Sequence, residues 1–110
     1  MLKIEAVIRS SKIYDVQAAL ADIGITTFSS YEVKISGIHK GHATLRNKAS
    51  DFIPKSKIEI LCADRDQEKI VKTVLDAAKT GEQGDGIIFV YQVMNLVKIR
   101  DSQVDESALK

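Results

Sequence analysis

The spacing of hydrophobic residues along the chain is typical first of a strand and then of a helix, and this order occurs twice. Residues 3–8 and residues 57–63 are apolar, extended segments that each open on the triplet Lys-Ile-Glu. A stretch with helical spacing of apolar residues follows each of them. The two apolar stripes are Val16, Ala19, Leu20 and Ile23 in the first half, and Ile70, Val71, Val74, Ala77 and Ala78 in the second. The pattern therefore predicts two strand-then-helix units.

Each predicted helix is followed by a glycine and then by another strand. Gly24 and Gly81 stand where the end of a helix favours a residue that can take a positive φ angle. Residues 31–36 alternate apolar and polar side chains, as a half-buried strand does, and residues 87–93 are rich in β-branched and aromatic residues. The order βαββαβ predicts an α+β, ferredoxin-like sandwich, in which a four-stranded antiparallel sheet carries both helices on one face.

The second face of this predicted sheet has no helix to cover it. Depending on the register of the strands, we expect this face to carry apolar residues such as Val7, Leu61 or Val90. A monomer should not expose an apolar surface of that size, so the sequence predicts that the protein forms an oligomer.

Two segments lie outside the repeat. Residues 37–54 are polar, show no sustained periodicity and are long for a loop in a compact domain, which is typical of a functional or disordered loop. Beyond Arg100 the chain has too few apolar residues to become ordered by itself. We expect this tail either to fold over a ligand or to fray.

Length and composition narrow the class of protein. A chain of 110 residues with 45% hydrophobic residues is expected to form a single domain with one core. Its net charge of +1 gives no electrostatic reason to expect a nucleic-acid partner. We find no signal peptide and no apolar run of about 20 residues, and Cys62 cannot form an internal disulfide. These features predict a cytoplasmic protein that does not insert into a membrane.

The most specific local motif is the glycine-rich turn TGEQGDG at residues 80–86. Successive flexible residues can turn their backbone N–H groups inward and form a nest for a phosphate, although sharp turning alone would also explain the glycines. Lys98 and Arg100 are expected on one side of an extended segment after the last strand. There they could hold a polyphosphate beside the nest, or they could be ordinary solvated charges.

Other candidate chemistry is weaker. His39, His42 and Cys62 invite a zinc site, but a structural site needs four ligands, so we expect loop histidines and a small buried cysteine. No Walker motif and no oriented pair of nucleophile and base can be recognised. We therefore predict that the protein is not an enzyme. The alternative is a nucleotide hydrolase that uses His39 or His42 as a general base.

Along essentially its full length the sequence resembles the PII signal-transduction proteins. The resemblance implies a homotrimer of ferredoxin-like subunits with ATP or ADP in the three clefts between subunits. It also implies that a long T-loop, about residues 37–54 here, engages a target such as a membrane transporter subunit or a metabolic enzyme. The tail would comprise about residues 98–110. The matching segments are residues 1–8, 15–25, 32–34, 40–42, 51–55, 57–60, 80–90 and 99–100.

The glycine-rich turn matches the phosphate-contacting B-loop of the family, with two losses of charge. Gly84, Asp85 and Gly86 resemble the B-loop residues. Ile87, the next residue of the predicted nucleotide site, stands where the family has Lys or Arg. Ile38 stands where a T-loop arginine is usual. Each lost charge-assisted contact could weaken binding by about 1.5–3 kcal/mol, so affinity for the more highly charged triphosphate should suffer most.

Six further residues match positions that line the nucleotide cleft of the family. In the family, the residue that Arg100 matches reaches in from a neighbouring subunit. Ser29 and Lys98 are conservative replacements for a threonine and an arginine, and Val7 and Leu61 resemble the apolar walls beside the adenine. The six residues are Val7, Ser29, Glu59, Leu61, Lys98 and Arg100.

The predicted T-loop begins at Gly37, which the resemblance also assigns to the nucleotide site, and the loop departs from the family pattern. His39 replaces the glutamine that helps to hold Mg²⁺ and 2-oxoglutarate, although Lys55 matches the lysine that pairs with the oxoglutarate carboxylate. We therefore expect a weak or absent response to 2-oxoglutarate, with the ATP/ADP ratio as the main input. The tyrosine of the uridylylation motif is absent, so we do not expect uridylylation. The residues predicted to contact a partner are Lys40, His42, Arg46, Lys48 and Ser50.

A third interpretation is a metal-binding trimer that resembles the CutA proteins. The CutA proteins share the predicted topology, but their sequences do not match this chain. Uptake of copper or zinc would favour this interpretation.

Overall fold

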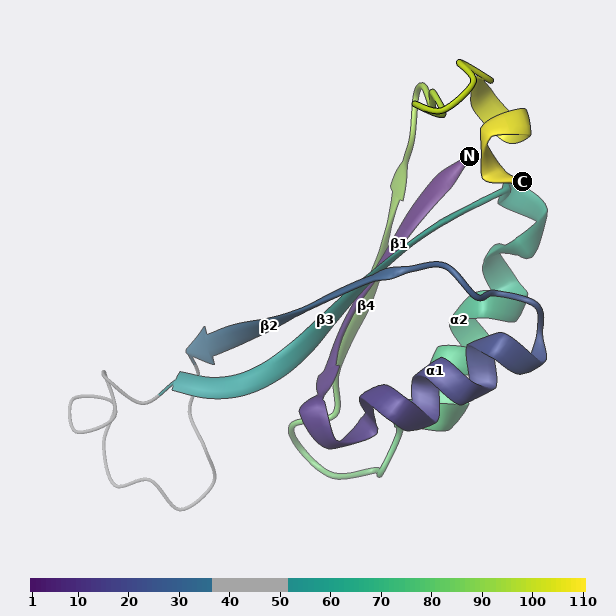
Figure 1. Cartoon of the computed structure of the whole chain (residues 1–110). Coiled ribbons are helices and arrows are strands. Elements are labelled where there is room, and N and C mark those ends of the chain that lie inside the picture. The colour runs from purple at the N-terminus through teal and green to yellow at the C-terminus, as the bar shows by residue number, and fades with distance from the viewer. Residues whose placement is uncertain (37–51) are drawn as a thin grey trace.

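The computed structural model describes residues 1–36 and 52–110. Its main elements follow the predicted order βαββαβ, so the ferredoxin-like prediction is confirmed (Figure 1). The strands are β1 (Leu2–Arg9), β2 (Ser29–Ser36), β3 (Phe52–Cys62) and β4 (Gly86–Gln92), and the helices are α1 (Ile13–Asp22) and α2 (Gln67–Ala78). Three short 3-10 helices are η1 (Ser10–Lys12), η2 (Asp64–Asp66) and η3 (Asp105–Leu109).

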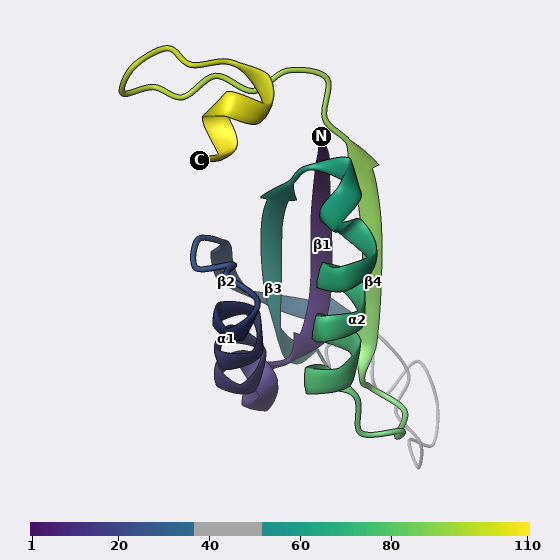
Figure 2. The same ribbon diagram turned by 90° about the vertical axis from the view of Figure 1, so that its right-hand side faces the viewer.

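The four strands form one antiparallel sheet in the order β2-β3-β1-β4, and both helices cover the same face of it (Figure 2). Residues that pair directly across two strands point to the same face of a sheet. Ile4 pairs with Ile60 on β3 and with Val90 on β4, and all three contribute to the core beneath the helices. None of the helices described in residues 1–36 and 52–110 is long and apolar enough to cross a membrane.

The hydrophobic core lies between the sheet and the apolar stripes of the two helices. Alternate residues of β1 and β3 point toward the helices, and their side chains are almost completely buried. Gly24, just after α1, has a φ angle of 87°, as the sequence predicted for the residue after the helix. The core residues with the largest buried side chains are Ile4, Ile8, Val16, Leu20, Ile58, Ile60, Ile70 and Val74.

The open face of the sheet differs from the sequence prediction at one residue. Val7 and Leu61 lie on this face as expected, but Val90 does not. Because Val90 pairs with the buried Ile4, its side chain points toward the helices. Its neighbours in β4, Phe89 and Tyr91, point to the open face instead.

The centre of the open face is charged. Glu5 is buried in β1, and its Oε1 lies 2.7 Å from Lys3 Nζ. Its Oε2 lies 3.4 Å from Lys57 Nζ and accepts no hydrogen bond from a described residue. Glu59 pairs with Glu5 across the two strands and accepts a 2.8 Å hydrogen bond from Tyr31. The hydrogen bond from Lys3 lowers the pKa of Glu5 in spite of its burial. Two glutamates and two lysines therefore balance each other on a face predicted to be mainly apolar.

Strand β2 and the beginning of β3 extend beyond the helices as a two-stranded ribbon (Figure 1). Tyr31 is 43% exposed and Ile35 is 39% exposed, so the prediction of a half-buried strand holds only for Val33. Neither α1 nor α2 covers this part of the sheet (Figure 1). Strand β3 begins at Phe52, so residues 52–54, predicted as the end of the long loop, belong to a strand.

The tail is ordered and turns back on itself. Val97 forms an isolated bridge with Val104, and between them the Ser102 N–H donates to the Lys98 carbonyl over 2.8 Å. Arg100 therefore lies in a turn, and the prediction of an extended segment there is wrong. Ser102 takes a φ angle of 61°, which permits the chain to reverse. Helix η3 then packs near the start of α2, where Arg65 lies 2.5 Å from Glu106.

Candidate functional site

The glycine-rich turn, residues 80–86, connects α2 to β4 at the end of the sheet where β1 finishes. Gly84 and Gly86 have φ angles of 105° and 103°, which side-chain-bearing residues rarely adopt. A Cβ atom on Gly86 would lie 1.8 Å from the carbonyl oxygen of Val7. The turn can therefore approach β1 this closely only because residue 86 is glycine.

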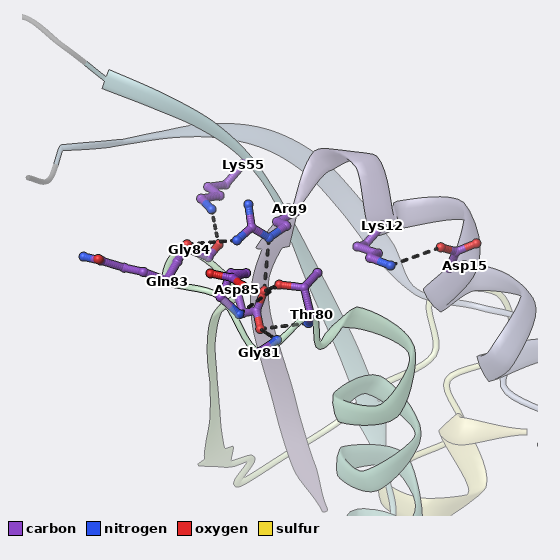
Figure 3. Close-up of polar contacts among 10 residues, drawn as sticks. Arg9, Lys12, Asp15, Lys55, Thr80, Gly81, Gln83, Gly84 and Asp85 are labelled. Carbon is purple, nitrogen blue, oxygen red and sulfur yellow. Dashed lines mark hydrogen bonds and ion pairs between the residues drawn. The ribbon is translucent and has the colours of Figure 1, made fainter. Parts of the chain in front are cut away.

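The Asp85 carboxylate lies inside the turn and holds its shape (Figure 3). It accepts hydrogen bonds from the Thr80 hydroxyl at 2.5 Å, the Thr80 N–H at 2.9 Å and the Gly81 N–H at 2.8 Å. Arg9 adds a fourth from Nε at 3.1 Å. The side chain of Asp85 is thus committed to the loop, which leaves backbone groups of the turn as the part suited to an anion.

These donors lower the pKa of Asp85 well below its usual range, the hydroxyl of Thr80 being the largest cause. Because the pKa is lower in the folded than in the unfolded chain, the stabilisation is complete above the unfolded value and is lost as the pH falls through the folded one. We expect Asp85→Asn to reduce the melting temperature at pH 7, and the difference from the wild type to shrink between about pH 4 and pH 2. Thermal unfolding followed by circular dichroism over this pH range tests the prediction; a difference that stays constant would contradict it.

Two cations from the sheet contact the turn. Arg9, the last residue of β1, also donates from Nη2 to the carbonyl of Gln83 over 2.9 Å. Lys55, which pairs with Arg9 across β1 and β3, donates to the carbonyl of Gly84. Burial lowers the pKa of Lys55, and the nearby Arg9 charge lowers it further. Lys55 was predicted for a 2-oxoglutarate region, whereas here its described contact is with the glycine-rich turn.

Arg9 was not among the predicted site residues, because a single arginine at the end of a strand matches no motif. One signal could have found it. Arg9 lies two residues after Val7 and therefore on the same face of β1. The alternation of a strand thus directs Arg9 to the side on which the predicted site lies.

A hollow of about 340 Å³ lies beside the turn, between β4 and the end of α2. This is the lower part of the size range typical of small-molecule sites. The hollow brings together four residues predicted to bind nucleotide, and apolar side chains of α2, including Val74 and Leu75, form its other wall. The four residues are Val7, Asp85, Gly86 and Ile87.

A second group of predicted residues lies on the open face, nearer to the tail. Ser29 pairs with Glu59 across β2 and β3, so both point to the same face. Leu61 follows Glu59 by two residues and is 45% exposed on that face. Leu61 also lines a hollow of about 390 Å³ that is partly covered by η3 and Lys110.

The predicted phosphate-binding cations lie in the tail. Lys98 donates a hydrogen bond to the backbone oxygen of Lys110, which itself lines the hollow beside Leu61. Arg100 is exposed in the turn of the tail, and its Nη2 lies 3.9 Å from Asp101. The tail residues are therefore associated with the second group and not with the glycine-rich turn.

One chain does not join the two groups. Ile87 pairs with Val7 at the end of β1, whereas the chain leaves the sheet toward the tail after Gln92, which pairs with Leu2 at the other end (Figure 1). The five residue-to-residue steps from Ile87 to Gln92 span about 17 Å of extended strand. Hydrogen bonds to a phosphate need distances of about 3 Å, so the turn and the tail of one chain cannot hold the same phosphate.

Val7 and Leu61, the two residues predicted to flank the adenine, are also far apart within one chain. Val7 pairs with Lys57, four residues before Leu61 in β3. The two side chains thus lie about 13 Å apart along the sheet, and one chain does not place them on either side of a single ring.

Several residues predicted for the T-loop or the nucleotide site lie outside the described part of the structure. Cys62 lies within the described part. Cys62 is buried in β3 among the core residues, and burial raises the pKa of its thiol. The predicted residues outside the described range are Gly37, Ile38, His39, Lys40, His42, Arg46, Lys48 and Ser50.

Comparisons with known proteins match almost the whole chain. A family model described as Nitrogen regulatory protein P-II matches residues 1–103. The chain is 40% identical to the Nitrogen regulatory protein P-II of Pasteurella multocida and 43% identical to the Nitrogen regulatory protein P-II 1 of Escherichia coli, covering 99% of this chain and 100% of each relative. The solved structure of Arabidopsis thaliana PII bound to citrate has a TM-score of 0.84 at 32% identity, with 97% of this chain and 90% of that one covered.

Proposed function

The chain belongs to the P-II family of nitrogen regulatory proteins, and from this we propose that it binds an adenine nucleotide and thereby controls a target protein. In this proposal ATP or ADP binds with its phosphates on the turn of residues 80–86. The protein acts as a regulator and not as an enzyme.

The observation that carries the proposal is the division of the predicted site into two groups. The turn offers backbone N–H groups beside an apolar hollow, while Glu59, Leu61, Lys98 and Arg100 lie toward the opposite end of the sheet. If the turn of one copy faces the tail end of another, the two groups complete one nucleotide cleft. A heterologous contact forms a ring when its rotation closes, and we propose that this one closes as a homotrimer with three such clefts.

The open face of the sheet suits contact with further copies of the chain. Its central charges consist of two lysines and two glutamates and are therefore balanced within each copy. Leu61 and Tyr91 are 45% and 44% exposed beside them. Removing these apolar side chains from water would favour association, and the existing ion pairs reduce the cost of burying the charges.

The charges near the turn favour a nucleotide with few phosphates. Arg9 and Lys55 supply positive charge, but Ile87, which is 62% exposed next to the turn, supplies none. A γ-phosphate would add negative charge without the cation that the family usually places at residue 87. We therefore propose that ADP competes well with ATP and that the ATP/ADP ratio is the main signal.

Regulation follows from linkage between the nucleotide and the target. A nucleotide that binds one conformation of the protein more tightly shifts the population by that difference in affinity, and a target that prefers the same conformation strengthens nucleotide binding in return. We propose that the loop beginning at Gly37 makes the contact with the target, a transporter subunit or a metabolic enzyme. A weak response to 2-oxoglutarate and the absence of uridylylation are parts of this proposal.

Isothermal titration calorimetry tests the binding step. We expect ADP and ATP each to bind at one site per chain, with or without Mg²⁺, and 2-oxoglutarate to bind weakly even when ATP and Mg²⁺ are present. Ile87→Lys should raise the affinity for ATP about tenfold, because it restores one charge-assisted contact, and should change the affinity for adenosine less than twofold. An absence of heat with millimolar ADP and ATP would overturn the proposal. Tight binding of 2-oxoglutarate would overturn only the weak-response part.

A further inference from the structure

Arg9 connects the glycine-rich turn to the sheet. Its backbone belongs to the last residue of β1, and its side chain extends from there to the turn (Figure 3). The guanidinium group reaches two acceptors at once, Asp85 Oδ1 at 3.1 Å and the Gln83 carbonyl at 2.9 Å. These acceptors lie on the two sides of Gly84 in the sequence, so the guanidinium spans the first residue of the GDG motif.

The turn also packs directly on the guanidinium. A Cβ atom added to Gly84 would lie 3.2 Å from Nη2 of Arg9 and 3.6 Å from its Cζ. Residue 84 therefore lies close to the guanidinium group, and a side chain there would crowd it.

The bonds to Asp85 show what Arg9 adds. The Thr80 and Gly81 donors belong to the same turn as Asp85, so they shape the turn internally. Among the described residues, Arg9 is the only donor to Asp85 from outside the turn. Without Arg9 the turn would lose this tie to β1, and its internal bonds to Asp85 would open more often.

An arginine fits this role better than a lysine would. The planar guanidinium presents several N–H donors in a fixed fork, whereas an ammonium group is a single point charge. Lys55 illustrates the difference, since its one described hydrogen bond reaches a single acceptor, the Gly84 carbonyl. A bond to the Asp85 carboxylate is also charge-assisted and stronger than a neutral one.

From these contacts we propose that Arg9 is a positioning residue, which acts through Asp85 to hold residues 83–86 in the shape that receives the phosphates of the nucleotide. This inference rests on the proposed nucleotide binding and names the residue that prepares the site. Arg9 acts on affinity by setting the backbone of the turn before the ligand arrives, which reduces the cost of ordering the turn on binding.

Substitution of Arg9 tests the proposal, with Lys12 as a matched control. Both side chains are 29% exposed and both are ion-paired, but Lys12 pairs with Asp15 at 3.8 Å on α1 and away from the turn (Figure 3). We expect Arg9→Met to weaken ADP binding about tenfold, and Lys12→Met to change it less than twofold. Adenosine, which lacks phosphates, should bind both variants with less than a twofold change. Equal effects of Arg9→Met and Lys12→Met on ADP would overturn the proposal.

Two further variants separate positioning from direct contact with the phosphate. If Arg9 acts through Asp85, the double variant Arg9→Met/Asp85→Asn should have about the same ADP affinity as whichever single variant binds ADP less tightly. Fully additive losses would overturn the proposed route. Arg9→Lys keeps the charge but can reach only one acceptor, so its ADP affinity should stay closer to that of Arg9→Met than to the wild type. Full recovery by lysine would show that charge alone matters.

A readout without nucleotide keeps this inference separate from the proposed function. The Thr80 and Gly81 amides donate to Asp85 in the turn that Arg9 holds. Their hydrogen exchange in the free protein should be about tenfold faster in Arg9→Met than in Lys12→Met. If the wild type bound no ADP, the proposed function would fail, and this exchange experiment would still decide whether Arg9 positions the turn. Unchanged exchange would overturn the positioning role.

Discussion

A mixture of the Ile87→Glu and Arg100→Glu variants should regain about a quarter of the ADP sites that each variant loses alone. In a cyclic homotrimer each proposed cleft takes the turn from one copy and the tail from the next. Ile87→Glu places a negative charge beside the turn, and Arg100→Glu places one in the tail, so either variant alone has no intact cleft. After random assortment, about one contact in four joins an intact turn to an intact tail.

Both substitutions suit this experiment because the side chains are exposed, Ile87 by 62% and Arg100 by 81%. The variants should therefore fold and can be refolded together and titrated by calorimetry. The control is a mixture of Lys98→Glu with Arg100→Glu, because both changes lie in the tail and no combination restores an intact tail. A cleft formed within one chain would give no recovery in either mixture. Equal recovery in both would also contradict the shared cleft.

Gly86→Ala should destabilise the protein by about 3 kcal/mol or more, because two separate costs add. The φ angle of 103° is unfavourable for any residue with a side chain. In addition, the new Cβ would lie 1.8 Å from the backbone oxygen of Val7. Since a backbone atom cannot rotate away, the first pair of the β1–β4 ladder, Ile8 with Gly86, would have to separate. Thermal or denaturant unfolding measures this loss.

Gly81→Ala provides the control for Gly86→Ala. Gly81 also has a positive φ angle, 87°, but a Cβ atom there meets no atom within 4 Å. It should therefore show only the cost of the backbone conformation, about 1–2 kcal/mol. If the two variants unfolded at the same denaturant concentration, the close approach of the turn to Val7 would not be a constraint on the fold.

Local patterns predicted most of the secondary structure. The two helices end at Asp22 and Ala78, close to the glycines that were predicted to mark their ends. These features depend on residues near each other in the chain, so their spacing carries the information. The predicted loop of residues 37–54 was too long because neither α1 nor α2 covers Phe52 and its neighbours, and an exposed ribbon shows little apolar alternation.

The face on which each side chain lies depends on strand pairing, which links residues far apart in sequence. The apolar run of β4 has no polar residue among residues 87–91 to mark its outer face, so the prediction could not tell Val90 from Phe89. Pairing with Ile4 placed Val90 in the core. Likewise, Lys3, Glu5, Lys57 and Glu59 became one network only because β1 and β3 lie side by side in this register.

By itself the sequence determined the order of elements, the core stripes of the helices and the glycine-rich turn, because each of these depends on residues close together in the chain. Only the tertiary structure decided that Arg9 reaches across to Asp85, that Arg100 lies in a turn, and that the predicted nucleotide residues form two groups at opposite ends of the sheet. The physical reason is that a side chain's partners are set by strand register and by the path of the chain between strands. The pairing of β1 with β4 brings their ends together, so Arg9 and Asp85 meet although they are 76 residues apart in the sequence.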